Sequence, residues 1–195
     1  MKDIVFDVGR VLIDFRYDAL FQFFYERGVH FKSVHDFAEK TDLKAYECGR
    51  ISNDDFINNL AKLFNQPLDL SLLMNQWTEI FEPITEMLDF ALDLKKTHRI
   101  FFLSNTSALH WEYLLSEYKL KEIATDLLAS FQVGAMKPER KIFKEAERRF
   151  GLLPGETLFI DDIEENALGA VSCGWHGIHH VGIEETKIRI KTWLS

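Results

Sequence analysis

The sequence predicts an α/β fold, in which a parallel β-sheet carries helices on both faces and one all-helical segment interrupts the pattern. Short, nearly continuous apolar runs alternate with segments of helical periodicity along much of the chain. Such alternation is typical of parallel sheets whose strands are buried on both sides. The stretch of about residues 15–82 breaks the alternation, because its apolar residues recur every three or four positions and no strand is apparent in it.

Five apolar runs are predicted to be the strands of the sheet. The first, residues 4–6, ends at Asp7 and runs into a turn at Val8-Gly9-Arg10. The other four are residues 100–103, 128–131, 157–160 and 175–181.

Helix signals fill the segments between these runs. Within residues 15–82, Ser52 followed three positions later by Asp55 resembles an N-terminal capping signal. Pro83 and Pro138 are each predicted to open a helix, since proline is favoured in the first helical turn, and Gly151 is predicted to close the second. Further helices are predicted after a cap at Ser107 or Thr106, through Ala167 to Gly174, and over residues 188–194.

Together these elements predict a Rossmann-like, doubly wound parallel sheet with an inserted α-helical cap. The core is predicted to consist of residues 1–14 and 83–195, and the cap of residues 15–82. The chain length of 195 residues suits one core with a modest insertion.

Composition narrows the range of partners. The 31 acidic and 23 basic residues give a net charge of −8 without any basic run, so we expect no nucleic-acid partner. No apolar run approaches the ~18 residues of a membrane span, and the N-terminus lacks a secretory pattern, so we expect no membrane association. Cys48 and Cys173 lie far apart in the sequence, and we expect reduced thiols in a cytoplasmic protein.

Polar side chains stand at the ends of four predicted strands. Asp7 follows the first strand and Ser104 the second. Lys137 comes just past the third, and Asp161 and Asp162 end the fourth. Because the carboxyl ends of parallel strands share one edge of the sheet, where ligands bind, we expect these residues to converge on one site.

The residue types at this edge indicate a chemistry. Carboxylates at strand ends favour a hard cation with oxygen ligands, and Mg²⁺ fits best. A lysine and a serine among carboxylates suit phosphate oxygens. An aspartate such as Asp7 can also be a covalent nucleophile that forms an aspartyl-phosphate, provided that Mg²⁺ and Lys137 offset the repulsion between the two anions.

Four segments, in this order, resemble the motifs of the haloacid dehalogenase superfamily. They are Phe6-Asp7-Val8-Gly9-Arg10-Val11-Leu12, Leu103-Ser104-Asn105, Met136-Lys137-Pro138, and Phe159-Ile160-Asp161-Asp162 with Asn166. A helical cap after the first motif is similar to one subclass of this superfamily. The cap segment of residues 46–52 and the start Phe-Asp-Val-Gly resemble its branch of sugar-phosphate phosphatases such as glucose-1-phosphatase.

The resemblance implies the hydrolysis of a small phosphorylated metabolite, a phosphomonoester such as a sugar phosphate. It implies that Asp7 is the nucleophile, that Ser104 and the backbone amide near Asn105 bind phosphate, and that Lys137 neutralises Asp7 and phosphate. The implied Mg²⁺ ligands are Asp7, the backbone carbonyl of Gly9, Asp161 and Asp162.

Gly9 departs from the family pattern, which usually has an aspartate general acid at this position. General acid catalysis is typically worth about 10²–10⁴-fold. Either another group, such as Asp14 or the cap residue Glu47, supplies the proton, or the leaving group is good enough without one. Because Gly9 cannot donate a proton, a second alternative is that the chain is a catalytically weak phosphate-binding protein. The other alternative is a 2-haloacid dehalogenase, which would need no metal, whereas the Asp161-Asp162 pair favours phosphate chemistry.

Overall fold

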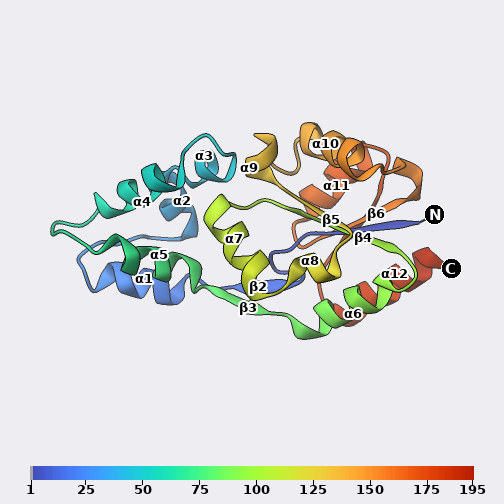
Figure 1. The fold of residues 1–195 in the computed structure, drawn as a ribbon, viewed down its shortest axis with the longest axis horizontal. Helices are drawn as coiled ribbons and strands as arrows, with labels where there is room; N and C mark the ends of the chain where they lie inside the picture. The colour runs from blue at the N-terminus through green and yellow to red at the C-terminus, as the bar shows by residue number, and fades with distance from the viewer. Residues whose placement is uncertain (1) are drawn as a thin grey trace.

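A five-stranded β-sheet forms the centre of the core in the computed structural model, which describes residues 2–195 (Figure 1). Its strands lie in the order β5-β4-β1-β6-β7, and all four pairings are parallel. They are β1 (Asp3–Phe6), β4 (Arg99–Ser104), β5 (Asp126–Ala129), β6 (Thr157–Asp161) and β7 (His176–His179). The predicted doubly wound parallel sheet is therefore confirmed.

Helices cover both faces of the sheet. Successive side chains of a strand point to opposite faces, and the apolar side chains on each face pack against one layer of helices. Phe6, Phe102 and Ile160 face one layer of helices, and Val5, Phe101 and Phe159 face the other. The first layer contains α6 (Thr85–Lys95), α7 (Ala108–Glu117), α8 (Leu120–Ile123) and α12 (Ile183–Leu194). The second contains α10 (Arg140–Phe150) and α11 (Glu164–Ser172). Figure 1 shows α10 and α11 above the sheet and α6 and α12 below it.

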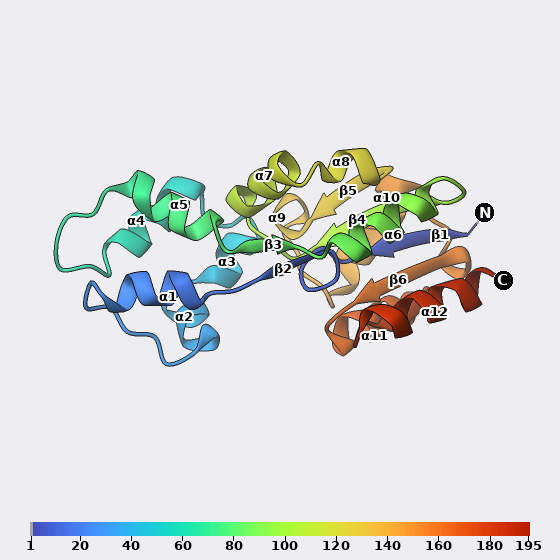
Figure 2. The same ribbon diagram turned by 90° about the horizontal axis from the view of Figure 1, so that it is seen from below.

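Five further helices, here called the cap helices, lie beyond the carboxyl ends of the sheet strands (Figures 1 and 2). They are α1 (Asp18–Tyr25), α2 (Val34–Thr41), α3 (Leu43–Glu47), α4 (Asn53–Ala61) and α5 (Leu70–Thr78). They have a hydrophobic cluster of their own, whose largest fully buried side chains are Trp77, Tyr46, Phe24, Phe37 and Phe56. The exact division into a core and a cap of residues 15–82 stays a prediction.

A two-stranded antiparallel ribbon, which the sequence did not reveal, joins the cap helices to the core. It pairs β2 (Ile13–Phe15) with β3 (Phe81–Pro83). Each strand has only three residues, too few for an alternating pattern to stand out. Pro83 pairs with Ile13 in this ribbon and does not open a helix, since α6 begins at Thr85.

Other expected boundaries are also shifted. The last helix begins at Ile183 and not at residue 188, and the fifth strand covers residues 176–179 and not 175–181. The third strand covers residues 126–129 and not 128–131, and Ser130–Val133 form the short helix α9. The side chain of Gln132 accepts a hydrogen bond from the backbone N–H of Ala129 at 3.0 Å, and this local bond ends the strand. The helix expected from Pro138 begins only at Arg140. The expected caps are confirmed, because Ser52 accepts from the N–H of Asp55 and a left-handed Gly151 ends α10.

Two compositional expectations can be compared with the structure. Cys48 and Cys173 are buried free thiols, as expected. Over residues 2–195, none of the helices combines the length and the apolar composition that crossing a bilayer requires.

A glycine in α11 allows this helix to lie against the loop that carries Lys137. A Cβ atom at Gly169 would lie 2.8 Å from Cβ of Pro138 and 3.1 Å from the ring of Phe143. We predict that Gly169→Ala lowers the free energy of unfolding by about 1–3 kcal/mol, because this overpacking outweighs the ~1 kcal/mol gained in helix propensity. Urea denaturation beside Gly155→Ala, whose Cβ would meet no atom within 4 Å, measures the difference. Equal stability of the two variants would contradict the close packing.

Candidate active site

Asp7, Lys137 and Asp161 meet at the carboxyl edge of the sheet, where β1 and β6 end side by side. Nζ of Lys137 lies 2.7 Å from Oδ1 of Asp7 and 2.7 Å from Oδ2 of Asp161. It also donates a hydrogen bond to the carbonyl oxygen of Leu103 at 2.9 Å. All three charged side chains are buried. One ammonium group therefore has three oxygen acceptors and fixes the positions of two carboxylates.

Burial and charge act in opposite directions in this cluster. Burial raises the pKa of Asp7 to about 7, while Lys137 lowers it and Asp161 raises it further. Burial lowers the pKa of Lys137, but the carboxylates of Asp7 and Asp161 raise it more, so it ends above its usual value. Lys137 is therefore charged at neutral pH, and additional positive charge beside Asp7 would keep Asp7 ionised as well.

The two adjacent aspartates at the end of β6 have different environments. Oδ1 of Asp161 accepts hydrogen bonds from the backbone N–H of Ile163 at 2.9 Å and from Nδ2 of Asn166 at 3.0 Å. Its Oδ2 faces Lys137, so both oxygens are used. Asp162 is partly exposed and takes part in no ion pair among residues 2–195. Its carboxylate is thus the freer of the two, and burial followed by the charge of Asp161 raises its pKa.

Oxygen atoms of Asp7, Asp161 and Asp162 lie within 4.8 Å of one another. We call these three residues the carboxylate cluster. Three acidic groups around a single lysine leave an excess of negative charge, and oxygen donors at this spacing suit a hard divalent cation. The donor set therefore fits Mg²⁺.

The side chain of Asn105 binds the main chain of Lys137. Its Oδ1 accepts from the N–H of Lys137 at 2.8 Å, and its Nδ2 donates to the carbonyl oxygen of Lys137 at 3.0 Å. With both backbone groups held in this way, Lys137 stays in a loop, and the following helix starts only at Arg140. The side chain of Asn105 is thereby fully occupied by the main chain of Lys137.

A small cavity of about 50 Å³ lies between the core and the cap helices. The core contributes Gly9, two residues after Asp7, together with Ser104 and Asn105. The remaining lining residues are Phe15, Tyr17, Glu47, Phe81, Thr106, His110 and Leu114. Ser104 is buried at the end of β4. The structure thus brings Gly9, Ser104 and Asn105 together with Glu47, whereas neither Asp7 nor Asp14 is among the residues that line the cavity.

Tyr17 and His110 are cavity residues that the sequence did not single out. Nε2 of His110 donates to the carbonyl oxygen of Trp77 at 2.9 Å, and the two rings stack with centroids 4.2 Å apart. Burial lowers the pKa of His110 to about 4, so this side chain is neutral and joins α7 to α5. Neither residue belongs to a polar motif, so only the packing of the cap helices on the core identifies them.

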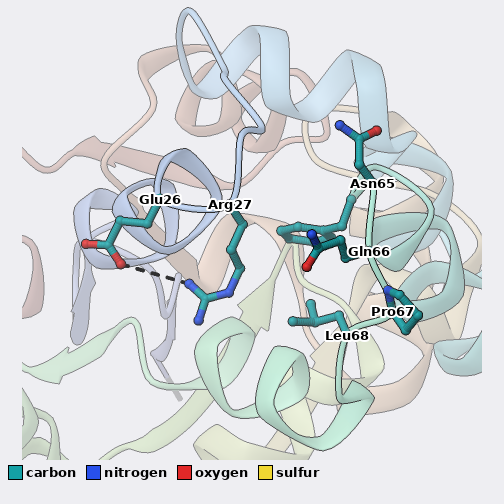
Figure 3. Close-up of a pocket in the computed structure, with 7 residues that line it drawn as sticks. Glu26, Arg27, Asn65, Gln66, Pro67 and Leu68 are labelled. Carbon is teal, nitrogen blue, oxygen red and sulfur yellow. Dashed lines mark ion pairs between the residues drawn. The ribbon is translucent and has the colours of Figure 1, made fainter.

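A larger hollow of about 390 Å³ lies at the far end of the cap helices (Figure 3). Glu26, Arg27 and residues 64–68 line it. Arg27 is already paired there, with Nη1 3.9 Å from Oε2 of Glu26 and a hydrogen bond to the carbonyl oxygen of Phe23 at 3.0 Å. Because the carboxylate cluster lies elsewhere, at the sheet edge, we assign the chemistry to the smaller cavity.

Comparisons with known proteins identify the family of the chain. The chain matches the haloacid dehalogenase-like hydrolase family over residues 1–174. It is 30% identical over 175 residues to a D-ribitol-5-phosphate phosphatase of Bacteroides thetaiotaomicron, with 85% of each chain covered.

Two solved structures have the same fold over nearly the whole chain. A haloacid dehalogenase family enzyme of Bacteroides thetaiotaomicron, in complex with magnesium and inorganic phosphate, superposes with a TM-score of 0.79 at 25% identity and covers 90% of this chain and 92% of its own. A predicted hydrolase of the same type from Porphyromonas gingivalis gives a TM-score of 0.78 at 28% identity, with 97% and 98% covered. The resemblance seen in the four motifs is therefore confirmed, and the chain belongs to the haloacid dehalogenase-like hydrolase family.

Proposed function

We propose that this chain is a Mg²⁺-dependent phosphatase that hydrolyses a small phosphomonoester through an aspartyl-phosphate on Asp7. The asymmetric environment of the Asp7 carboxylate carries the proposal. Oδ1 is paired with Lys137 and accepts the N–H of Val8 at 2.7 Å. Oδ2 receives no hydrogen bond from the residues that the structure describes. One oxygen is held in place, and the other is free to attack phosphorus.

The remaining roles follow from position and charge. Lys137 offsets the negative charge of Asp7 and of the incoming phosphate, and Asp161 positions Lys137. The hydroxyl of Ser104 and the backbone N–H of Asn105 bind phosphate oxygens.

Mg²⁺ would be held by the carboxylate cluster and the backbone carbonyl of Gly9. When bound, it supplies positive charge that stabilises the phosphoryl group in the transition state. The magnesium and phosphate in the related Bacteroides thetaiotaomicron structure support this assignment.

The cap helices favour a small substrate. The cavity of about 50 Å³ is lined by Tyr17 and Glu47 from this segment beside Ser104, which favours a small molecule over a protein or nucleic-acid substrate. The named activity of the 30% identical relative supports a sugar or sugar-alcohol phosphate. A 2-haloacid dehalogenase would also use Asp7 but needs no cation, and the carboxylate of Asp162, which forms no ion pair within residues 2–195, favours the phosphatase.

We predict that Asp7→Asn lowers kcat for any hydrolysed phosphomonoester by on the order of 10⁴-fold or more, because the attacking oxygen is lost. Chelation of Mg²⁺ should abolish turnover by the wild type, and added Mg²⁺ should restore it. Phosphate release measured beside Asp93→Asn, an exposed aspartate on α6, provides the comparison. Full activity in chelator, or in Asp7→Asn, would exclude the proposed mechanism.

The two adjacent aspartates should respond differently to the same substitution. We expect Asp162→Asn to raise the Mg²⁺ concentration at half-maximal activity by at least about tenfold with little loss of stability. Asp161→Asn should instead lower the free energy of unfolding by about 1–3 kcal/mol, because a fully buried and fully bonded carboxylate loses part of its network. Metal titration of activity and urea denaturation measure these effects. If Asp161→Asn instead weakened Mg²⁺ activation and Asp162→Asn lowered the free energy of unfolding, Asp161 would be the freer metal ligand.

A further inference from the structure

The end of α3 is fixed to the core next to residues 104–106, which follow β4. Oγ of Ser130 lies 2.6 Å from the carbonyl oxygen of Glu47, and the same Oγ accepts the N–H of Thr106 at 3.0 Å. Two residues further on, Gly49 has φ +67°, and a Cβ there would lie 2.4 Å from the carbonyl oxygen of Phe131. Only a glycine allows this close approach. Ser130 therefore bridges the main chain of Glu47 to that of Thr106, which is two residues after Ser104.

Glu47 lines the same small cavity as Gly9 and Ser104. It is partly buried and takes part in no ion pair among residues 2–195. Burial raises its pKa to about 8, so the carboxyl group is protonated at neutral pH. Tyr17 lines the same cavity, and burial and then the charge of Glu47 raise its pKa.

The other titratable side chains of the cavity are less suited to donate a proton. Because only a protonated nitrogen can donate to a carbonyl, the single ring proton of neutral His110 is used on Trp77. Tyr17 has a pKa above its already high usual value, although Arg10 lowers it slightly. Among the residues lining the cavity, Glu47 is thus the acid whose proton is available near neutral pH.

An acid at position 9 would be crowded by an apolar ring. A Cβ at Gly9 would lie 3.1 Å from the ring of Phe15, so the ring would have to shift by a few tenths of an ångström. Asp14 bonds to the N–H of Phe15 at 2.9 Å and lies 3.7 Å from Nε of Arg10, which directs its carboxylate to partners outside the cavity.

We propose that Glu47 of the cap helices is the general acid and base of the phosphatase reaction. This inference rests on the proposed function. As Oδ2 of Asp7 bonds to phosphorus, the bond from phosphorus to the ester oxygen breaks, and that oxygen keeps the electron pair and takes the proton of Glu47. The Glu47 carboxylate then removes a proton from water, whose oxygen attacks phosphorus. The bond from phosphorus to Asp7 breaks, and its electron pair returns to the aspartate. Alcohol and phosphate leave, and Glu47 is again protonated.

The test compares two phosphate esters with similar rings but different leaving groups. In p-nitrophenyl phosphate the leaving oxyanion is stable, whereas in benzyl phosphate it is a strongly basic alkoxide. We expect Glu47→Gln to lower kcat/KM for benzyl phosphate by about 10²–10⁴-fold and that for p-nitrophenyl phosphate by less than about tenfold. Glu39→Gln, an exposed glutamate on α2, is the matched control and should change neither.

A second measurement needs no variant. Because the acid must be protonated, wild-type kcat/KM for benzyl phosphate should fall as pH rises through about 8, while that for p-nitrophenyl phosphate should not. Tyr17 and His110, which share the cavity, titrate well above and well below this range.

The outcomes separate the two proposals. Equal losses on both esters, no loss, or a wild type that hydrolyses only p-nitrophenyl phosphate would overturn the role of Glu47. In each of these cases Mg²⁺-dependent turnover that is lost in Asp7→Asn would still support the phosphatase. No turnover of either ester by the wild type with Mg²⁺ would contradict the phosphatase itself.

Discussion

The ion pairing of Lys137 with Asp7 and Asp161 is the interaction on which the site depends. A buried lysine is stable only with close acceptors, and here the acceptors come from three different strand ends: Asp7, the carbonyl of Leu103 and Asp161. The main chain of Lys137 is held by Asn105. The four motifs of the sequence therefore form one bonded network around a single ammonium group, which explains why they occur together.

This network places opposing demands on the fold. Apolar side chains on both faces of the sheet shield the ion pairs from water, and this burial strengthens the attraction between the charges. The same burial penalises each carboxylate, and three acidic groups share one lysine. The excess negative charge lowers the stability of the fold, and a bound divalent cation would offset it. A site that is electrostatically incomplete in this way is suited to catalysis, since its groups are arranged before the substrate arrives.

Much of the core could be predicted because its signals are local. Continuous apolar runs identify β1, β4 and β6, and the rule that parallel strands share a carboxyl edge brings Asp7, Ser104 and Asp161 together. The strands β2 and β3 are too short to have a pattern, and Pro83 misleadingly indicates a helix start. At the end of β5, Gln132 accepts a hydrogen bond from the N–H of Ala129, a contact that the apolar pattern does not indicate.

The surroundings of the cavity could not be predicted, because they arise from contacts between distant segments. Glu47 reaches the cavity through the contact of its carbonyl with Ser130, 83 positions later in the chain, and through the close approach at Gly49. The occupied side chain of Asn105 depends on a loop 32 positions away. Residue types at strand ends therefore indicate which chemistry is present, but only the packing shows which groups are free to take part.

Acid quenching of a single turnover with ³²P-labelled p-nitrophenyl phosphate and Mg²⁺, followed by peptide mapping, would show where the phosphoryl group is carried. If Asp7 is the nucleophile held by Lys137, the label is expected on the peptide that contains Asp7, in an acyl bond that hydroxylamine cleaves. Turnover without any labelled peptide, or with the label on another residue, would contradict the assignment of Asp7.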